Sequence, residues 1–483
     1  MVHVFNIATM VLLLEWLLRL WFILYIPKKR EPSSAIAWLL VVFLLPEFGV
    51  LLFFALGNSK LSRHRQAIQR YLDKLIENIT KRLTVDSSSL TEAEHQRYDP
   101  IIDLAQGLGK MPLSVNNTAK ILPEYDKAIT EITKSISRAT EFVHLEYFIF
   151  VYDETTKPLF IALEQAVNRG VTVRVLFDWY GTRRYPNYRL MKRELTRMGV
   201  SWHKMLPPKL GGNYSRPDLR NHRKIVVVDD TVAYLGSQNM VDRTYHRKDS
   251  IVYDELVVEL SGPIVRQCDT FFASDWYAET SEDLRALVDP HKRPLAPSTG
   301  TVKAQVVPSG PGYKVSGNLQ LFTQLIYAAK KRIVITNPYF IPYESLMVAC
   351  KSAAQRGVEV ILINSEVIDQ PGVGYAQRSY YEDLLEAGVK IYLYKAPTLL
   401  HSKHLTIDDD IAVIGSSNMD IRSFALDLEC VVVLYDKSVV KDLGKVQQKD
   451  LSNAKLVTLK SWRTRPLRYK FLESIMRLTS ALQ

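Results

Sequence analysis

Two segments of this chain carry the same pattern of residues able to act on a phosphate group. Both read His-x-Lys-x4-Asp, with His222, Lys224 and Asp229 in the first and His401, Lys403 and Asp408 in the second. Seven residues after each Asp stands Gly-Ser-x-Asn, which adds Ser237, Asn239, Ser416 and Asn418. A doubled motif with one fixed offset indicates a duplicated unit that brings two histidines and two lysines to one site.

These residue types suit phosphoryl transfer. Imidazole titrates near neutral pH, so one histidine can attack phosphorus while the other delivers a proton. Lysine is a point charge that neutralises phosphoryl oxygens, and hydroxyl and amide groups add hydrogen-bond donors. Because the lysines supply the positive charge, the pattern predicts a site that needs no metal and no cofactor.

The residues after each histidine are apolar and β-branched, at 225–228 and 405–407, and predict strands. Side chains alternate along a strand, so each motif His and Lys should face the same way. Asp229 and Asp408 lie at odd spacing from their histidines and begin turns. We interpret both as structural groups that hold the end of the strand.

The repeat extends beyond the motif. Residues 142–150 match 332–342, and Asn168–Val173 match Gln355–Val360. The sequence pattern of each half predicts an alternation of three helices and three strands. Nearly all-apolar strands between helices predict an α/β fold with a mainly parallel sheet, covered on both faces, in each half. Pro290–Thr301 is the predicted joint between the halves.

The doubled motif resembles the signature of the phospholipase D superfamily. The resemblance implies two similar phospholipase D-like halves packed side by side, with the active site at their seam. It also implies that one histidine becomes phosphorylated while the other is the general acid and base. An acidic residue downstream in each half then orients a histidine, and the matching positions are Glu255 and Glu429.

Several shorter segments resemble bacterial cardiolipin synthases, and this resemblance covers essentially the whole chain. The segments are residues 219–229, 307–311, 337–342, 377–381 and 417–424. This resemblance implies phosphatidyl transfer between two phosphatidylglycerol molecules, giving cardiolipin and glycerol through a phosphatidyl-histidine. The expected partners are anionic phospholipids, phosphatidylglycerol and cardiolipin, in a membrane. Another phosphatidyltransferase or a phospholipase D hydrolase would use the same residues, and a membrane-tethered nuclease is a further alternative.

The N-terminus is strongly apolar at Val4–Ile26 and Ala35–Leu56, which predicts a membrane helical hairpin. Glu15 and Arg19 are placed to pair on one helix face. Pro46 interrupts the second segment, which leaves either a kinked span or a re-entrant hairpin. More basic residues follow the second segment than the first, which favours a multi-pass protein of the bacterial cell membrane with its catalytic part in the cytoplasm.

The composition of the chain agrees with a membrane anchor joined to a catalytic part. The chain has 483 residues and a net charge of +11, which suits an anionic membrane or nucleic acid, and the apolar anchor favours the membrane. Three scattered cysteines indicate a reducing compartment.

The predicted parts are an anchor at 1–57, a linker region at 58–121 and phospholipase D-like halves at 122–290 and 302–483. Leu61–Leu83 predicts a basic amphipathic helix, on the membrane or capping the globular part, and Lys460–Leu482 is similar.

Overall fold

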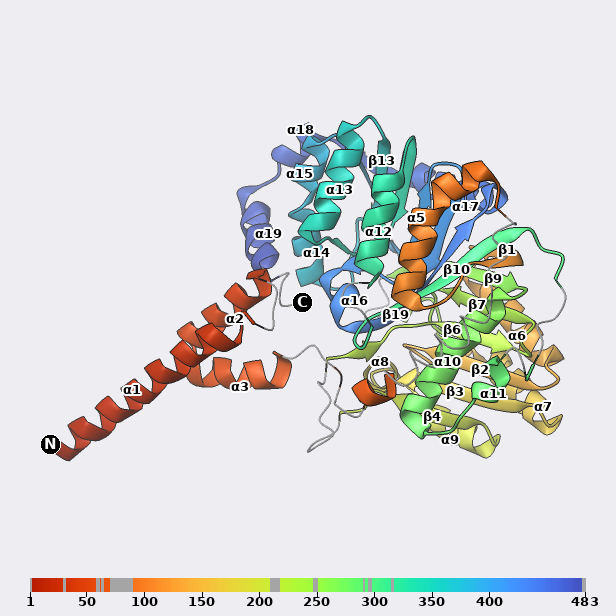
Figure 1. The fold of residues 1–483 in the computed structure, drawn as a ribbon, viewed down its shortest axis with the longest axis horizontal. Helices are drawn as coiled ribbons and strands as arrows, with labels where there is room; N and C mark the ends of the chain where they lie inside the picture. The colour runs from red at the N-terminus through yellow and green to blue at the C-terminus, as the bar shows by residue number, and fades with distance from the viewer. Residues whose placement is uncertain are drawn as a thin grey trace.

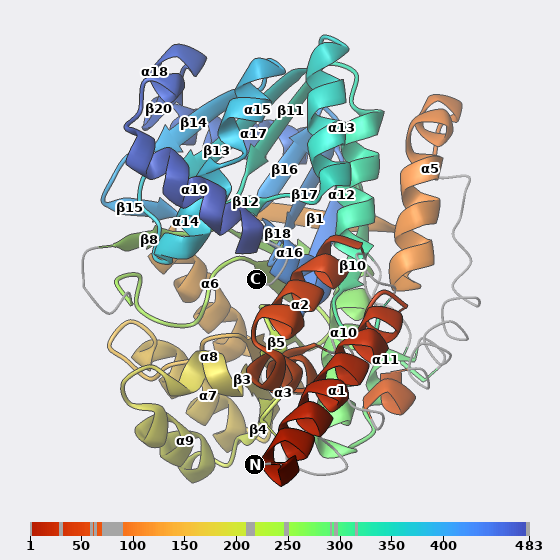
Figure 2. The same ribbon diagram turned by 90° about the vertical axis from the view of Figure 1, so that its left-hand side faces the viewer.

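The computed structural model describes residues 2–28, 32–57, 61, 65–69, 90–208, 218–245, 251–289, 292–293, 298–313 and 317–479. Three N-terminal helices project from a large globular part that contains one continuous sheet with helices packed on it (Figures 1 and 2). The predicted helix at Leu61–Leu83 lies mostly outside the described residues, as does part of the predicted joint at Pro290–Thr301.

The first half of the globular part follows helix α5 (Glu92–Gly109). Its elements are β1 (Ser114–Leu122), α6 (Tyr125–Arg138), β2 (Phe142–Tyr147), α7 (Lys157–Asn168), β3 (Thr172–Asp178), α8 (Trp179–Arg183), α9 (Tyr188–Arg197), β4 (Ser201–Met205), β5 (Arg220–Asn221), β6 (Ile225–Val228), β7 (Val232–Gly236), β8 (Val252–Asp254), β9 (Val257–Ser261), α10 (Ile264–Thr280) and α11 (Arg285–Val288). The predicted alternation of helices and strands is confirmed from α6 to β4.

The second half repeats this order. Its elements are β10 (Val302–Ser309), α12 (Gly317–Ala328), β11 (Arg332–Thr336), β12 (Phe340–Ile341), α13 (Glu344–Gln355), β13 (Glu359–Ser365), α14 (Pro371–Arg378), α15 (Tyr381–Glu386), β14 (Lys390–Tyr394), β15 (Thr398–Leu400), β16 (His404–Ile407), β17 (Ile411–Gly415), β18 (Met419–Asp420), α16 (Ile421–Ala425), β19 (Asp427–Tyr435), α17 (Lys437–Ser452), β20 (Ala454–Val457), α18 (Leu459–Arg463) and α19 (Leu467–Thr479). The duplication that the repeated motifs predict is therefore also present in the order of helices and strands.

The prediction of a mainly parallel sheet in each half is wrong. Strands β2, β3 and β4 are parallel, but β6, β7, β9 and β1 continue the sheet antiparallel, and the second half has the same arrangement. The reason lies in the turn after the motif strand. Asp229 and Asp230 both have positive φ and connect β6 directly to β7, and so short a connection permits only antiparallel pairing.

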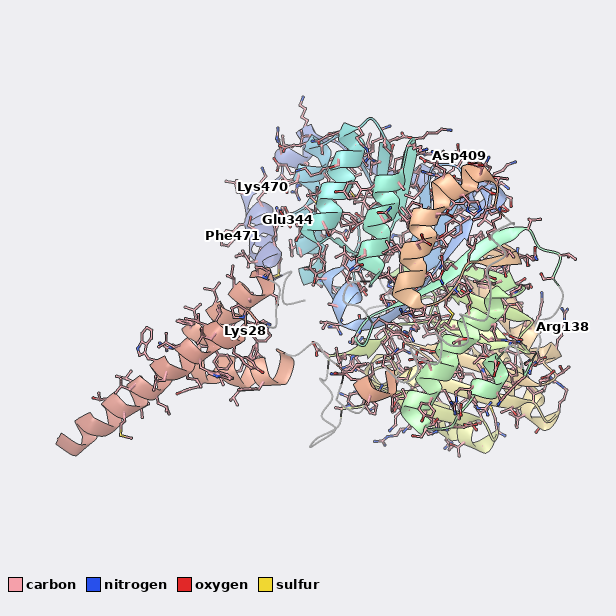
Figure 3. All side chains as sticks on the ribbon, in the orientation of Figure 1. Lys28, Arg138, Glu344, Asp409, Lys470 and Phe471 are labelled. Atoms are coloured by element: carbon pink, nitrogen blue, oxygen red, sulfur yellow. The ribbon has the colours of Figure 1, made fainter. Side chains whose placement is uncertain are left out.

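The two halves share one sheet because β1 pairs antiparallel with β10, its counterpart in the repeat. Each half has its own apolar core, and a third core lies at the junction, with Val258 and Phe271 from one half and Val432 and Leu434 from the other. Side chains fill the space between sheet and helices (Figure 3). Burying each such side chain contributes roughly 1.5–3 kcal/mol, so the junction holds the halves as one unit.

The N-terminal segment forms α1 (Val2–Tyr25), α2 (Pro32–Leu44) and α3 (Pro46–Leu56). The predicted pairing of Glu15 with Arg19 is present at 3.4 Å. Pro46 splits the predicted second segment into two helices because proline cannot donate the backbone hydrogen bond that would continue α2. Within the described parts of the chain, none of the helices has both the length and the apolarity for crossing a bilayer.

The glycine that opens each Gly-Ser-x-Asn block ends a strand, β7 or β17, in close contact with the next strand. A Cβ atom on Gly236 would lie 2.3 Å from the carbonyl oxygen of Leu256, and one on Gly415 would lie 2.4 Å from that of Cys430. Any larger residue would therefore push apart the strands that carry the candidate site.

We expect Gly415→Ala to lower the free energy of unfolding by about 1–3 kcal/mol, because the added methyl group meets backbone rather than a movable side chain. Gly444→Ala in α17 is the matched control, since its Cβ would meet nothing within 4 Å and alanine favours a helix by up to about 1 kcal/mol. Chemical denaturation measures both, and equal stability of the two variants would contradict the close-contact explanation.

Candidate active site

Each motif histidine follows a short strand that pairs with the opposite half. Strand β5, just before His222, runs parallel to the start of β19, and the backbone N–H of His222 donates to the carbonyl of Leu428 at 2.8 Å. Strand β15, just before His401, runs parallel to β8, and the N–H of His401 donates to the carbonyl of Asp254 at 2.7 Å. The two halves thus hold each other's histidine by the same backbone contact.

The carboxylate expected to orient each histidine also comes from the opposite half. Nδ1 of His222 lies 2.9 Å from Oε1 of Glu429, and Nδ1 of His401 lies 2.7 Å from Oε1 of Glu255. Both histidines are more than nine-tenths buried, and both glutamates are almost completely buried. Because a carboxylate accepts at Nδ1, that nitrogen carries the proton and Nε2 is left for the substrate.

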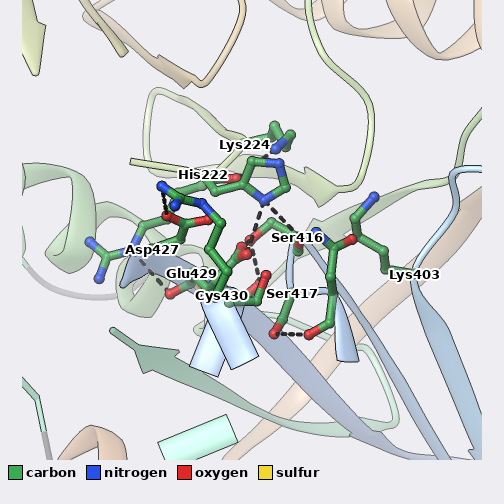
Figure 4. A network of polar contacts seen from close by, with 12 residues as sticks. His222, Lys224, Lys403, Ser416, Ser417, Asp427, Glu429 and Cys430 are labelled. Atoms are coloured by element: carbon green, nitrogen blue, oxygen red, sulfur yellow. Dashed lines mark hydrogen bonds and ion pairs between the residues drawn. The ribbon is translucent and has the colours of Figure 1, made fainter. Parts of the chain in front are cut away.

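The His222 contact belongs to a polar network (Figure 4). The carbonyl of Ser416 also accepts from Nδ1 of His222, at 3.1 Å. The Ser416 hydroxyl donates to Oε2 of Glu429 and accepts from the N–H of Cys430 at 3.0 Å. With its carboxylate fixed at both oxygens, Glu429 holds the His222 ring in a defined orientation.

Lys224 and Lys403 are buried next to their histidines. Each Nζ donates to the carbonyl oxygen of its own motif histidine at 2.6 Å. The histidines and lysines precede the strands instead of lying within them, since β6 begins at Ile225 and β16 at His404. The predicted common direction of His and Lys agrees with the second motif, where Nζ of Lys403 also lies 3.2 Å from Nδ1 of the His401 ring. In the first motif the contact to the carbonyl oxygen does not test it.

Burial dominates the electrostatics of the site. It lowers the pKa of Lys224 to about 7 and that of Lys403 to about 8, since charged ammonium groups are poorly solvated there. Burial and the neighbouring lysines also lower the pKa of His222 and His401, and burial raises the pKa of Glu429 to about 7. A phosphodiester anion placed among these cations would stabilise their charged forms.

The remaining motif donors contact the backbone around the site. Ser237 matches Ser416, since its hydroxyl accepts from the N–H of Leu256 at 3.0 Å, next to Glu255. The side-chain oxygen of Asn239 accepts from the N–H of Ile149 at 3.2 Å. The corresponding oxygen of Asn418 is buried without a hydrogen-bond partner among the described residues. A phosphate-binding role for these four side chains stays a prediction.

Asp229 and Asp408 lie apart from the histidines, at the far ends of β6 and β16, where we expected structural groups. Asp229 accepts from the backbone N–H groups of 140–142, and Asp408 from those of 330–332. Asp408 also accepts from Arg97 at 2.6 Å. Although burial opposes it, these hydrogen bonds and Arg97 hold the pKa of Asp408 below its usual value.

Sequence reasoning missed the aromatic residues that surround the histidines. Phe148 meets the His222 ring edge to face at 5.0 Å, and the rings of Tyr253 and Tyr339 meet that of His401 at 5.4 and 6.0 Å. The hydroxyls of both tyrosines donate to Asp369, at 3.1 and 2.5 Å. The repeated Tyr-Phe and Pro-Tyr-Phe segments at 147–148 and 338–340 were the available signal.

Comparison with known proteins agrees with the geometry. The family model "Cardiolipin synthase, PLD-like domain" matches residues 132–276 and 322–451, which contain both motifs. A second model, "Phospholipase D-nuclease N-terminal", matches residues 17–58. The cardiolipin synthase of Geobacillus kaustophilus is 32% identical over 94% of this chain and 90% of its own length. Cardiolipin synthase A of Proteus mirabilis is 31% identical over 94% of each chain.

Among solved structures, the phosphatidylserine synthase of Haemophilus influenzae has a similar fold. The TM-score is 0.59 at 14% sequence identity, over 79% of this chain and 98% of that one. At this identity the likeness concerns the fold alone.

We expect Asp408→Ala to lower the free energy of unfolding by about 2–4 kcal/mol, because several backbone donors and Arg97 lose their acceptor. Asp409→Ala is the control, since the Asp409 carboxylate is 79% exposed and its loss should cost under about 0.5 kcal/mol. Since the pKa of Asp408 is lowered on folding, its contribution is complete above its ordinary pKa and is lost at more acidic pH. Chemical denaturation at several pH values measures the free energies of unfolding. Equal stability of Asp408→Ala and Asp409→Ala at neutral pH would refute the predicted stabilising role of Asp408.

We expect Glu255→Gln and Glu429→Gln each to lower kcat at least about tenfold with little change in KM, because the histidine stays in place but loses the charge that orients it. Glu154→Gln, at a side chain that is 93% exposed, should leave both constants unchanged. Steady-state kinetics on the full chain decides this. A rise in KM at constant kcat would assign the glutamates to substrate binding instead.

Proposed function

Because this chain belongs to the cardiolipin synthase family of phospholipase D-like proteins, we propose that it transfers a phosphatidyl group between two phosphatidylglycerol molecules, giving cardiolipin and glycerol. The observation that carries the proposal is the pair of buried histidines, each hydrogen-bonded through Nδ1 to a glutamate of the opposite half and each next to a buried lysine. This arrangement offers two imidazoles and a cationic pocket to one phosphodiester.

In the first step, Nε2 of His222 attacks phosphorus. The bond from phosphorus to the headgroup glycerol oxygen breaks, and His401 gives that oxygen its proton. The products are free glycerol and a phosphatidyl group bonded to His222. Lys224 and Lys403 stabilise the negative charge on the phosphoryl oxygens in the transition state. Burial lowers the pKa of His401, and the charge and hydrogen bond of Glu255 oppose this effect by favouring the protonated form that the step requires.

In the second step, a terminal hydroxyl of another phosphatidylglycerol attacks the phosphatidyl-histidine. His401, now neutral, takes the proton of this hydroxyl, and the bond from phosphorus to His222 breaks. One phosphodiester has been exchanged for another, so no nucleotide is consumed. Water has to be kept from the intermediate, and the deep burial of both histidines serves this purpose.

We also propose that the N-terminal segment attaches the protein to the bacterial cell membrane, with the catalytic part on the cytoplasmic side. Helices α1 to α3 expose large apolar side chains to solvent, among them Leu14 and Leu51, each at 70%. Apolar surface of this extent is typical of a membrane-contacting segment. The basic residues that follow the segment favour the cytoplasmic orientation.

Lipid product analysis tests the activity. The detergent-solubilised protein, incubated with phosphatidylglycerol alone and a chelator, should form cardiolipin and glycerol in equal amounts. Phosphatidic acid as the main product would make the protein a hydrolase. Reaction only after addition of another alcohol would make it a different phosphatidyltransferase.

We expect His222→Ala and His401→Ala each to lower turnover at least about a thousandfold, because each removes a group that exchanges a bond or a proton with the substrate. His95→Ala, at a partly exposed surface histidine of α5, should retain full turnover. The same product assay measures all three variants. Substantial activity in either of the first two would overturn the two-histidine mechanism.

A further inference from the structure

Helix α19 exposes a row of large apolar side chains. The members are Leu467 at 81% exposure, Phe471 at 67%, Ile475 at 38% and Leu478 at 78%. Their spacing of four, four and three residues places them on one face of the helix. Four large apolar side chains in one row on a well-formed helix make a continuous apolar stripe, which we call the α19 stripe.

The opposite side of α19 is already fixed to the protein. Glu473 is buried and accepts from both terminal nitrogens of Arg465, at 2.5 and 2.9 Å. Arg477 donates to Asp383 of α15 at 3.1 Å, and α19 packs along α14. The helix is therefore anchored through its other side, and the stripe stays exposed.

Basic residues border the stripe. Lys470 and Arg468 lie on the same helix within one turn of Phe471, and Lys460 precedes it in the sequence. Arg463 and Arg465 also precede it, but they already pair with Glu382, Glu386 and Glu473 within the protein. An apolar face bordered by lysine and arginine matches the interface of an anionic bilayer, where acyl chains accept the apolar side chains and headgroups neutralise the cations. This charge complementarity favours lipid over a neutral apolar protein surface.

The position of α19 favours the same partner. It lies on the side of the globular part from which α1 to α3 project, and it is close to α2 in both views (Figures 1 and 2). Lys470 and Phe471 lie on this outer side, whereas Arg138 and Asp409 lie on the far side of the molecule (Figure 3). A bilayer that receives the apolar N-terminal helices would thus also meet the stripe.

We propose that the α19 stripe docks on an anionic lipid bilayer and forms a second membrane contact, separate in sequence from the N-terminal helices. Two contacts, one at each end of the chain, fix the orientation of the globular part on the membrane, which a single anchor leaves free. Helix α14, on which α19 packs, begins two residues after Asp369, the acceptor for Tyr253 and Tyr339 beside His401. The docked face is therefore connected through α14 to the aromatic residues beside His401.

Site-directed spin labelling tests this on the full chain. All three native cysteines are buried, so a cysteine placed on the surface is labelled selectively. We would label Phe471→Cys, with Arg138→Cys as a control on the opposite side, and reconstitute each into vesicles of phosphatidylcholine with phosphatidylglycerol. The label at 471 should be at least threefold less accessible to a water-soluble nickel chelate than the label at 138, and more accessible to oxygen.

Equal chelate accessibility at 471 and 138 would overturn the proposal. Spin–spin broadening between labels at 471 would also overturn it, because a second copy of the chain would then cover the stripe. The argument from the position of α19 rests on the proposed function, because it needs the N-terminal helices to attach to the membrane, whereas the exposed stripe and its bordering cations do not depend on that attachment. Leu14→Cys reports the N-terminal attachment independently, so a label that enters lipid at 471 but not at 14 would refute that attachment and leave the α19 contact standing.

Discussion

The candidate site depends on one constraint, which is that each histidine is held by the half of the molecule to which it does not belong. His222 hydrogen-bonds to Glu429, and His401 to Glu255, and the strands preceding the histidines pair with strands of the opposite half. Neither half alone can orient its own histidine. The continuous sheet through β1 and β10 and the shared core at the junction keep the halves in register, so the stability of this junction sets the geometry of the site.

This arrangement also concentrates charge. Two ammonium groups and two imidazoles are buried together, and burial lowers the pKa of all four. Cations removed from water need a compensating charge, and Glu255 and Glu429 supply part of it. A phosphodiester anion would supply more. Binding of the substrate and activation of the site are thus the same electrostatic event, which explains why the lysines are buried beside the histidines rather than exposed at the rim.

Much of this could be predicted from the sequence, because duplication and short-range patterns leave clear signals. The doubled motif, the helix–strand alternation and the structural role of Asp229 and Asp408 follow from spacing and turn chemistry. The pairing of the halves could not be predicted in this way. Which glutamate meets which histidine depends on β1 joining β10, a contact between residues far apart in the sequence that no local pattern records. The prediction of mainly parallel pairing was wrong for a different reason. The apolar character of the strands is the same in parallel and antiparallel pairing, and the tight turn at Asp229 and Asp230, which decides between them, is a local feature of the sequence.

The duplication has nevertheless produced two unequal histidines. Between His222 and Lys224 stands Arg223, which is fully buried, pairs with Asp275 and donates to the carbonyl of Glu429 at 3.1 Å. The equivalent position in the second motif is Ser402, whose hydroxyl has no hydrogen-bond partner among the described residues. Glu429 is thus fixed through its backbone as well as its carboxylate. A ring held this firmly suits a nucleophile that must keep one trajectory to phosphorus, whereas a proton carrier has to serve two different oxygen atoms in turn. The unequal support of the two imidazoles therefore favours His222 as the attacking group and His401 as the acid and base.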